Sequence, residues 1–186
     1  MITFPHPGKE NTAAALDLAL DYALAHRLDI VVATCSGETA LALLDRAKAA
    51  GFAGRLVAVS HVYGMARPGE NELPEDTRRQ LEAAGVTVVT AAHALSGGER
   101  GLSKQFGGVS PVEIAAHTLR MFGQGAKVCV EIALMALDCG AIPYGKPVVA
   151  VGGTAVGADT ALVLSPAYTA NLLDTRIHTV LCKPWL

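Results

Sequence analysis

The chain has 186 residues, a length that suits one domain, residues 1–186, around a single core. An apolar fraction of 51% with only 17% charged residues excludes a disordered chain. The formal net charge of −2 provides no basic field, so we expect neither nucleic acid nor a membrane surface among its partners. Every apolar run is also interrupted before the roughly 18 residues that a membrane-spanning helix needs.

The first residues and the cysteines indicate the compartment. Residues 1–9 contain two prolines, a histidine and a glycine in place of the continuous apolar stretch of a signal peptide. The four cysteines form no CxxC pair, and His26, His117 and His178 have no metal-ligand spacing with one another or with cysteines. We therefore expect reduced thiols, a cytoplasmic location and no metal site.

The first half of the chain alternates between helical and strand patterns. Helices are expected from Asn11 or Thr12 to about His26, over 40–44 with an end near Gly51, and over 74–84. Buried strands are expected over 29–33, 55–60 and 86–89. A helix between two strands of one sheet makes a right-handed crossover, so the first two strands are expected to be parallel.

Residues 91–110 interrupt this alternation. They contain SGGERG (96–101) and FGG (106–108), and we interpret them as one long, charged loop and a candidate functional segment. Two helices (111–122 and 127–137) and three apolar strands (147–151, 160–164 and 179–182) are expected to follow. The order of elements predicts a single α/β domain.

Two loops are suited to hold a phosphate group. The first, TCSGET (34–39), joins a strand to a helix start, where backbone N–H groups and the positive end of the helix dipole converge. The second, GGTAVGAD (152–159), follows another strand, and its glycines Gly152, Gly153 and Gly157 let a ligand approach the backbone closely. A helix cap and a tight turn are the alternatives. Neither loop matches the Walker A or GxGxxG pattern, which disfavours an ordinary NTPase or dinucleotide enzyme.

The segment DIVVATCSGETA (29–40), followed by a helix and LVAVS (56–60), resembles the effector-binding C-terminal domain of pyruvate kinase. In that family a T-x-[ST]-G-R-[ST]-A loop grips a phosphate of a sugar bisphosphate. The resemblance places four residues at phosphate-gripping positions, namely Thr34, Ser36, Gly37 and Thr39. Glu38 stands where the family pattern has Arg.

The segment 147–160, which includes Thr154, resembles the last glycine-containing loop and hairpin of the same domain, which closes over the effector. The resemblance covers most of the chain. It implies a three-layer α/β/α fold whose sheet is mostly parallel, with an antiparallel hairpin at one edge.

Further phrases are similar to a stand-alone family of pyruvate-kinase-C-terminal-like proteins from archaea and bacteria. These phrases are GKENT (8–12), LSGGER (95–100), FGG (106–108), KVCVEI (127–132) and VGGT (151–154). This second resemblance implies a phosphate-bearing small molecule as the ligand and FMN as the cofactor, without a settled reaction. It also suggests that Asn11 and Thr12 reach the phosphate, with helix capping as the alternative.

Other side chains are candidates for contact with the same ligand. His61 follows a strand end, from which it would contact a flavin ring or exchange protons, unless it is a surface-loop histidine. His93, Arg100 and Phe106 lie in the segment 91–110, where an aromatic ring and a guanidinium can stack on a flavin or pair with a second substrate. A solvated, charged loop is the alternative for these three.

Three more polar residues have open roles. Glu131 lies within an apolar helix, where an ion pair with Lys127 is favoured over a ligand role. Asp159 either caps its loop or faces the ligand. Cys35 lies near a helix start, which activates thiols, but a packed thiol is favoured over a catalytic one.

Two functions follow from these observations. The first is an FMN-binding protein, in which any redox chemistry belongs to the flavin. The second is a regulatory or sensor domain that binds a phosphorylated metabolite without catalysis. Phosphoryl transfer is disfavoured because no Mg²⁺-binding carboxylate set accompanies the loops. Ala- and Leu-rich helices suggest a homo-oligomer.

Overall fold

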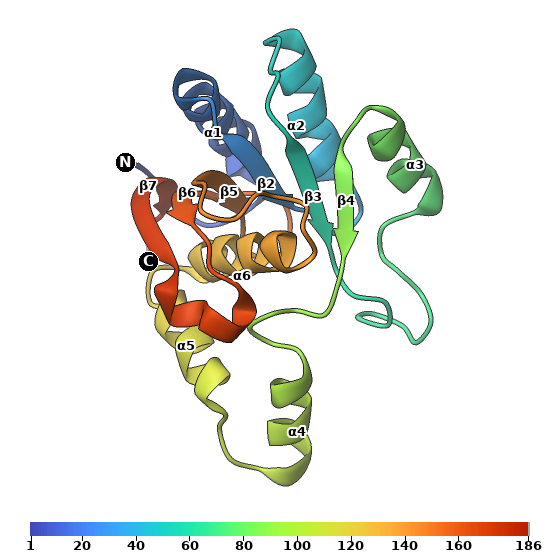
Figure 1. The fold of residues 1–186 in the computed structure, drawn as a ribbon, viewed down its shortest axis with the longest axis vertical. Helices are drawn as coiled ribbons and strands as arrows, with labels where there is room; N and C mark the ends of the chain where they lie inside the picture. Colours follow the sequence, from blue (N-terminus) through green and yellow to red (C-terminus); the bar gives the residue numbers. More distant parts are fainter. Residues whose placement is uncertain (186) are drawn as a thin grey trace.

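The computed structural model describes residues 1–185, which form a seven-stranded sheet with helices on both faces (Figure 1). The strands are β1 (Ile2–Phe4), β2 (Asp29–Ala33), β3 (Leu56–Ser60), β4 (Thr87–Thr90), β5 (Val148–Gly152), β6 (Thr160–Ser165) and β7 (Arg176–Pro184). The helices are α1 (Thr12–His26), α2 (Glu38–Ala49), α3 (Glu75–Ala83), α4 (Gly98–Phe106), α5 (Pro111–Arg120) and α6 (Gln124–Asp138), with the 3-10 helices η1 (Lys9–Asn11) and η2 (Thr169–Asp174).

The sheet has the strand order β1-β7-β6-β5-β2-β3-β4. From β5 to β4 all neighbours are parallel, whereas β6 is antiparallel to both β5 and β7. This topology confirms the predicted α/β fold with a mostly parallel sheet. One detail differs, because β1 pairs with β7 in parallel and forms the edge, so the antiparallel hairpin lies one strand inside it.

Alternation along the strands directs side chains into two cores. Ile30 and Val32 of β2 pack in the core that contains α1 and α2, whereas Val31 packs in the core that contains α6. Nearly every residue of α6 is buried, because the sheet lies on one side of this helix and α5 and η2 lie on others. The two cores produce the three layers that the resemblance implied.

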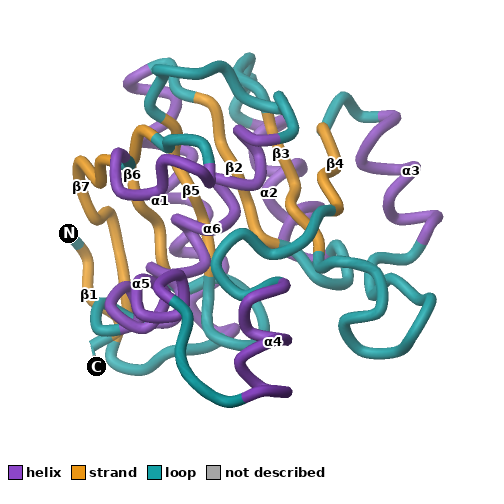
Figure 2. The backbone as a smooth tube through the Cα atoms, turned by 60° about the horizontal axis from the view of Figure 1, so that its bottom comes forward, coloured by secondary structure: helices purple, strands orange, loops and turns teal. Residues whose placement is uncertain are grey.

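Two elements depart from the sequence prediction. Residues 98–106 form α4, so the segment 91–110 is not one continuous loop. Its glycines disguise the helical pattern, and α4 buries no residue, so no apolar stripe faces a core. Figure 2 shows α4 standing outside the layer formed by α5 and α6.

The strand β1 was not predicted, because its three residues include only one buried side chain, Phe4. Within residues 1–185, no helix has the length and apolar character needed to cross a membrane.

Candidate functional site

The two predicted phosphate loops meet at one point of the sheet. From β2 the chain passes through α2 to β3 on one side, and from β4 it returns to β5 on the other side of β2. Because the connections diverge there, the carboxyl ends of β2 and β5 leave a crevice between their loops. A cavity of about 540 Å³ opens at this crevice, a size typical of small-molecule sites.

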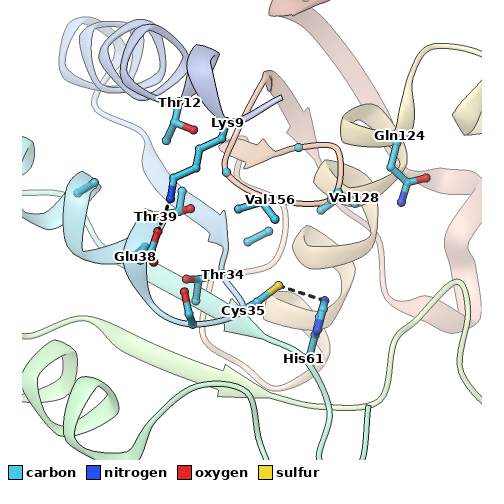
Figure 3. A pocket seen from close by; sticks show the side chains of 16 residues that line it. Lys9, Thr12, Thr34, Cys35, Glu38, Thr39, His61, Gln124, Val128 and Val156 are labelled. Carbon is cyan, nitrogen blue, oxygen red and sulfur yellow. Dashed lines mark hydrogen bonds and ion pairs between the residues drawn. The ribbon is translucent and has the colours of Figure 1, made fainter. Parts of the chain in front are cut away.

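Segments far apart in the sequence form the cavity wall (Figure 3). The lining residues are Lys9, Thr12, Ala33, Thr34, Cys35, Ser36, Glu38, Thr39, Ala42, His61, Gln124, Val128, Gly153, Ala155, Val156 and Gly157. The predicted residues Asn11, Gly37, His93, Arg100, Phe106, Gly152 and Thr154 are not among them. Sequence reasoning did not identify Lys9, Ala42, Gln124 or Val128 as part of the site.

The loop after β2 contains hydrogen-bond donors that have no acceptor within the protein. The hydroxyl of Thr34 is buried and has no hydrogen-bond partner, although the backbone N–H of Thr34 donates to the carbonyl of Val59 at 2.9 Å. Helix α2 begins after Gly37 with no side-chain cap, so no side chain accepts from the N–H groups of its first turn. An unpartnered buried hydroxyl costs about 1–3 kcal/mol of stability. A bound acceptor would remove that cost.

Gly37 serves packing rather than ligand approach. Its φ of 96° is left-handed, and a Cβ atom there would lie 2.3 Å from Thr77 Cγ2 and 3.0 Å from Leu73 Cδ1. The absence of a side chain therefore lets the loop lie against the start of α3. Gly37 lies in the predicted phosphate loop, but the atoms that come close to its Cα belong to Thr77 and Leu73 and not to a ligand.

The glycines after β5 are also used for packing. A Cβ at Gly152 would lie 2.9 Å from Val128 Cγ1 of α6, and one at Gly157 would lie 2.4 Å from Thr12 Oγ1. A Cβ at Gly153 would lie 2.4 Å from the carbonyl oxygen of Gly157. These glycines hold the loop against α6 and the start of α1, and Gly153 and Gly157 line the cavity as a result.

Asp159 caps its own loop, which decides between the two roles considered for it. Its buried carboxylate accepts hydrogen bonds from the backbone N–H of Gly8 at 3.3 Å and of Thr154 at 3.2 Å. The hydroxyl of Thr160 donates to it at 2.8 Å. This carboxylate therefore ties the loop after β5 to the segment before η1.

The start of α1 supports the same loop. Thr12 Oγ1 accepts a hydrogen bond from the backbone N–H of Ala158 at 3.0 Å, while Thr12 also lines the cavity. The side-chain amide of Asn11 donates to the carbonyls of His6 at 2.8 Å and Gly8 at 3.3 Å. Asn11 thus stabilises the entry to the helix and lies outside the cavity lining.

Lys9 supplies a positive charge at the cavity. Its Nζ lies 2.8 Å from Glu38 Oε2, so the pair connects η1 to the first turn of α2 (Figure 3). The hydrogen bond and the charge of Lys9 lower the pKa of Glu38. At the position where the pyruvate kinase pattern has Arg, this chain has a carboxylate with a lysine from a distant segment. The phrase GKENT was the only signal of Lys9 in the sequence.

His61 lies in the cavity wall between two partners. Its Nε2 is 3.4 Å from Cys35 Sγ, and its Nδ1 is 2.5 Å from Glu72 Oε2. The hydrogen bond with Cys35 contributes most to raising the pKa of His61 to about 9, and Glu72 adds to this effect, while burial opposes it. His61 is thus a partly exposed loop residue whose ring faces the cavity and two polar partners. Glu72 lies in a polar loop without a recognisable pattern, and sequence reasoning missed it.

The other predicted contacts lie elsewhere. The ring of His93 is 5.3 Å from that of His61, centroid to centroid, and faces a small neighbouring cavity of about 70 Å³. Burial lowers the pKa of His93. Arg100 lines a separate cavity of about 270 Å³ with Glu113 and Arg120, and Phe106 is 75% exposed.

Glu131 has a structural role. It forms an ion pair with Lys127, and both side chains are buried. Its Oε1 accepts hydrogen bonds from the backbone N–H of Leu95 at 2.9 Å and the hydroxyl of Ser96 at 3.0 Å. The pair therefore anchors the segment before α4 to α6. Among the described residues, no group of three His, Cys, Asp or Glu side chains is arranged to hold a metal ion.

A family model described as "Pyruvate kinase, alpha/beta domain" matches residues 12–164. The chain belongs to this family. The match includes both loops and most of the sheet, and so confirms the predicted similarity to the pyruvate kinase C-terminal domain. Lys9, β1 and β7 lie outside the part that the pyruvate kinase α/β domain model covers.

Proposed function

We propose that this protein binds a phosphate-bearing small molecule, FMN, with the phosphate at the loop 34–39. The buried hydroxyl of Thr34, which has no partner inside the cavity wall, carries the proposal. The uncapped first turn of α2 adds backbone donors, and Lys9 adds a positive charge from the opposite segment.

The cavity also suits the remainder of FMN. Ala33, Val128 and Val156 give it apolar surface for a flat ring, and His61 offers a polar group beside that surface. The stand-alone family that the sequence resembles supports the same cofactor. Bound FMN would supply redox chemistry, while the chain binds the phosphate and orients the ring.

FMN titration, followed by flavin absorbance and by thermal unfolding, tests this function. Binding to the native state raises the melting temperature. In Thr34→Val, one hydrogen bond to a charged group is lost, so we expect binding about tenfold weaker or more. Stability should stay equal or rise, since the unpartnered buried hydroxyl is removed.

Thr118→Val is the matched control, because its hydroxyl donates to the carbonyl of Ile114 on an exposed part of α5. This variant should bind FMN as the unmodified protein does. Equal FMN affinity in Thr34→Val and Thr118→Val would contradict the phosphate position.

The ion pair between Lys9 and Glu38 favours a second candidate, a sensor that binds a phosphorylated metabolite without catalysis. An incoming phosphate competes with Glu38 for Lys9 and so alters the link between η1 and α2. Thermal stabilisation by a sugar bisphosphate, without any by FMN, would favour this function. Stabilisation by FMN alone would contradict it. We place either function in the cytoplasm, where free thiols such as the four cysteines persist.

A further inference from the structure

Cys35, His61 and Glu72 form a continuous series of contacts that phosphate binding does not use. We propose that Cys35 is a nucleophilic thiol, that His61 takes its proton, and that Glu72 orients His61, so that the cavity transfers an acyl group from an activated ester or thioester. This activity goes beyond ligand binding and does not depend on FMN.

The sheet register brings the first two residues together. Ala33 of β2 lies beside Val59 of β3, and two residues further along each chain are Cys35 and His61. Cys35 and His61 therefore lie at equivalent positions beyond the carboxyl ends of two adjacent strands. A nucleophile in contact with a base, whose other nitrogen contacts a carboxylate, is the arrangement that activates cysteine and serine nucleophiles.

The loop that carries Glu72 is fixed by its neighbour Asn71. The side-chain amide of Asn71 donates to the carbonyl of His61 at 3.2 Å, and its side-chain oxygen accepts from the backbone N–H of Leu73 at 2.8 Å. Glu72 is thereby held against Nδ1 and leaves Nε2 facing Cys35. Because the two ring nitrogens point to opposite partners, no single metal ion could be shared by all three side chains.

Electrostatics favours a proton on His61. The hydrogen bond between Cys35 and His61 and the carboxylate of Glu72 raise the pKa of His61 to about 9, against the effect of burial. The ring of His93 lies 5.3 Å from that of His61, centroid to centroid, and burial lowers the pKa of His93. Behind His93, the charges of Glu131 and Lys127 are paired with each other. Helix α2 begins three residues after Cys35, so the positive end of its dipole lies near the thiol.

Cys35 is the cysteine that lines the proposed ligand cavity. It is partly exposed and lines the large cavity, whereas Cys129 and Cys182 are buried and burial raises the pKa of both. Cys139 is exposed, and its Sγ donates a hydrogen bond to the carbonyl of Ala136 at 3.4 Å. The chain thus contains its own control, an accessible thiol without a histidine beside it.

The reaction conserves electrons throughout. The thiolate of Cys35 attacks the carbonyl carbon, a C–S bond forms, and the bond to the leaving oxygen or sulfur breaks as that atom takes the proton from His61 Nε2. Water then attacks the resulting thioester and gives a proton to His61. The C–S bond then breaks, the carboxylic acid leaves, and the sulfur takes the proton back from His61, which restores the thiol.

The test uses the ligand-free protein and p-nitrophenyl acetate at pH 7. We expect a stoichiometric burst of nitrophenolate, with the acetyl group located on Cys35 by peptide mass spectrometry. Acetylation of Cys35 should be at least about tenfold faster than that of Cys139 and about a hundredfold slower after His61→Gln. Cys139→Ser should leave the burst unchanged. Glu72→Gln should move the pH profile of acylation to lower pH, because the carboxylate that it removes raises the pKa of His61, and lost packing alone would not produce this change.

Iodoacetamide labelling of the unmodified protein provides a measurement that needs no variant. Cys35 should be alkylated about tenfold faster than Cys139 at pH 7. Equal rates at the two thiols, in either assay, would overturn the proposal, as would a burst that survives His61→Gln. Neither assay contains FMN or phosphate. Failure of the acyl-transfer proposal can therefore be distinguished from failure of the proposed FMN binding.

Discussion

His61 keeps its charge over a pH range in which an unfolded histidine loses it. Its pKa rises from 6.5 to about 9, chiefly through Cys35 and then Glu72. A group whose pKa is raised by folding stabilises the native state below the unfolded value, and this contribution is lost as pH rises through the folded value. We expect the free energy of unfolding to fall between about pH 6.5 and 9, by about 1 kcal/mol after allowance for the partly exposed ring.

Urea unfolding at several pH values in this range measures that slope. His61→Gln should flatten the slope, because the variant has no titrating ring at this position. A slope in the unmodified protein no steeper than that of His61→Gln would contradict the assignment.

Part of the cavity wall could be predicted from the positions of polar residues after apolar strands. Thr34, Ser36, Glu38, Thr39 and His61 line the cavity because each follows the end of a buried strand, and such ends are recognisable from apolar runs. Lys9 and Glu72 were missed for a common physical reason. Each is a charged residue in an irregular segment, and only the tertiary fold brings it to its partner.

Two left-handed glycines can be compared, one in the loop after β5 and one in the loop after α2. Gly157 and Gly51 have φ values of 77° and 64°, but only Gly157 has atoms near its missing side chain. Gly51→Ala should cost about 1 kcal/mol, the price of the backbone conformation alone. Gly157→Ala should cost clearly more, because the added carbon meets Thr12 and Lys9, and it should weaken ligand binding as the loop moves.

Chemical denaturation and FMN titration of both variants decide this point. Equal losses of stability would show that the loop accommodates a side chain at 157. Unchanged binding in Gly157→Ala would show that the loop does not shape the cavity.

Elements were predictable where burial was strong. β2, β3 and β5 are buried strands that appear as continuous apolar runs, and α1 has apolar residues at helical spacing. The first half of β7 is exposed, so the prediction of 179–182 covered only its more buried part. β1 and α4 were not predicted, because the spacing of apolar residues in a sequence indicates which residues are buried, and these two elements bury almost none.

At the scale of the molecule, the apolar surface of the α4–α5 region is the place where we expect a second copy to bind. Large apolar side chains are exposed there, namely Leu102, Phe106, Val109, Ile114, Met121 and Phe122. Phe106→Asp should shift the molar mass in solution to that of one chain, whereas Tyr63→Asp, in the loop after β3, should not. Light scattering coupled to size exclusion measures this, and a monomeric unmodified protein would contradict the expected homo-oligomer.

The pairing of β1 with β7 has a consequence for the protein during its synthesis. Ile2 lies beside Cys182, and the backbone N–H of Trp185 donates to the carbonyl of Phe4 at 2.8 Å. A nascent chain can assemble β2, β3 and β4 while still on the ribosome, since their connections are local. The strand β1, which precedes Lys9, can however join the sheet only after residues 176–184 of β7 have emerged. We therefore expect the proposed ligand site, whose Lys9 follows β1, to be completed only after β7 has been synthesised.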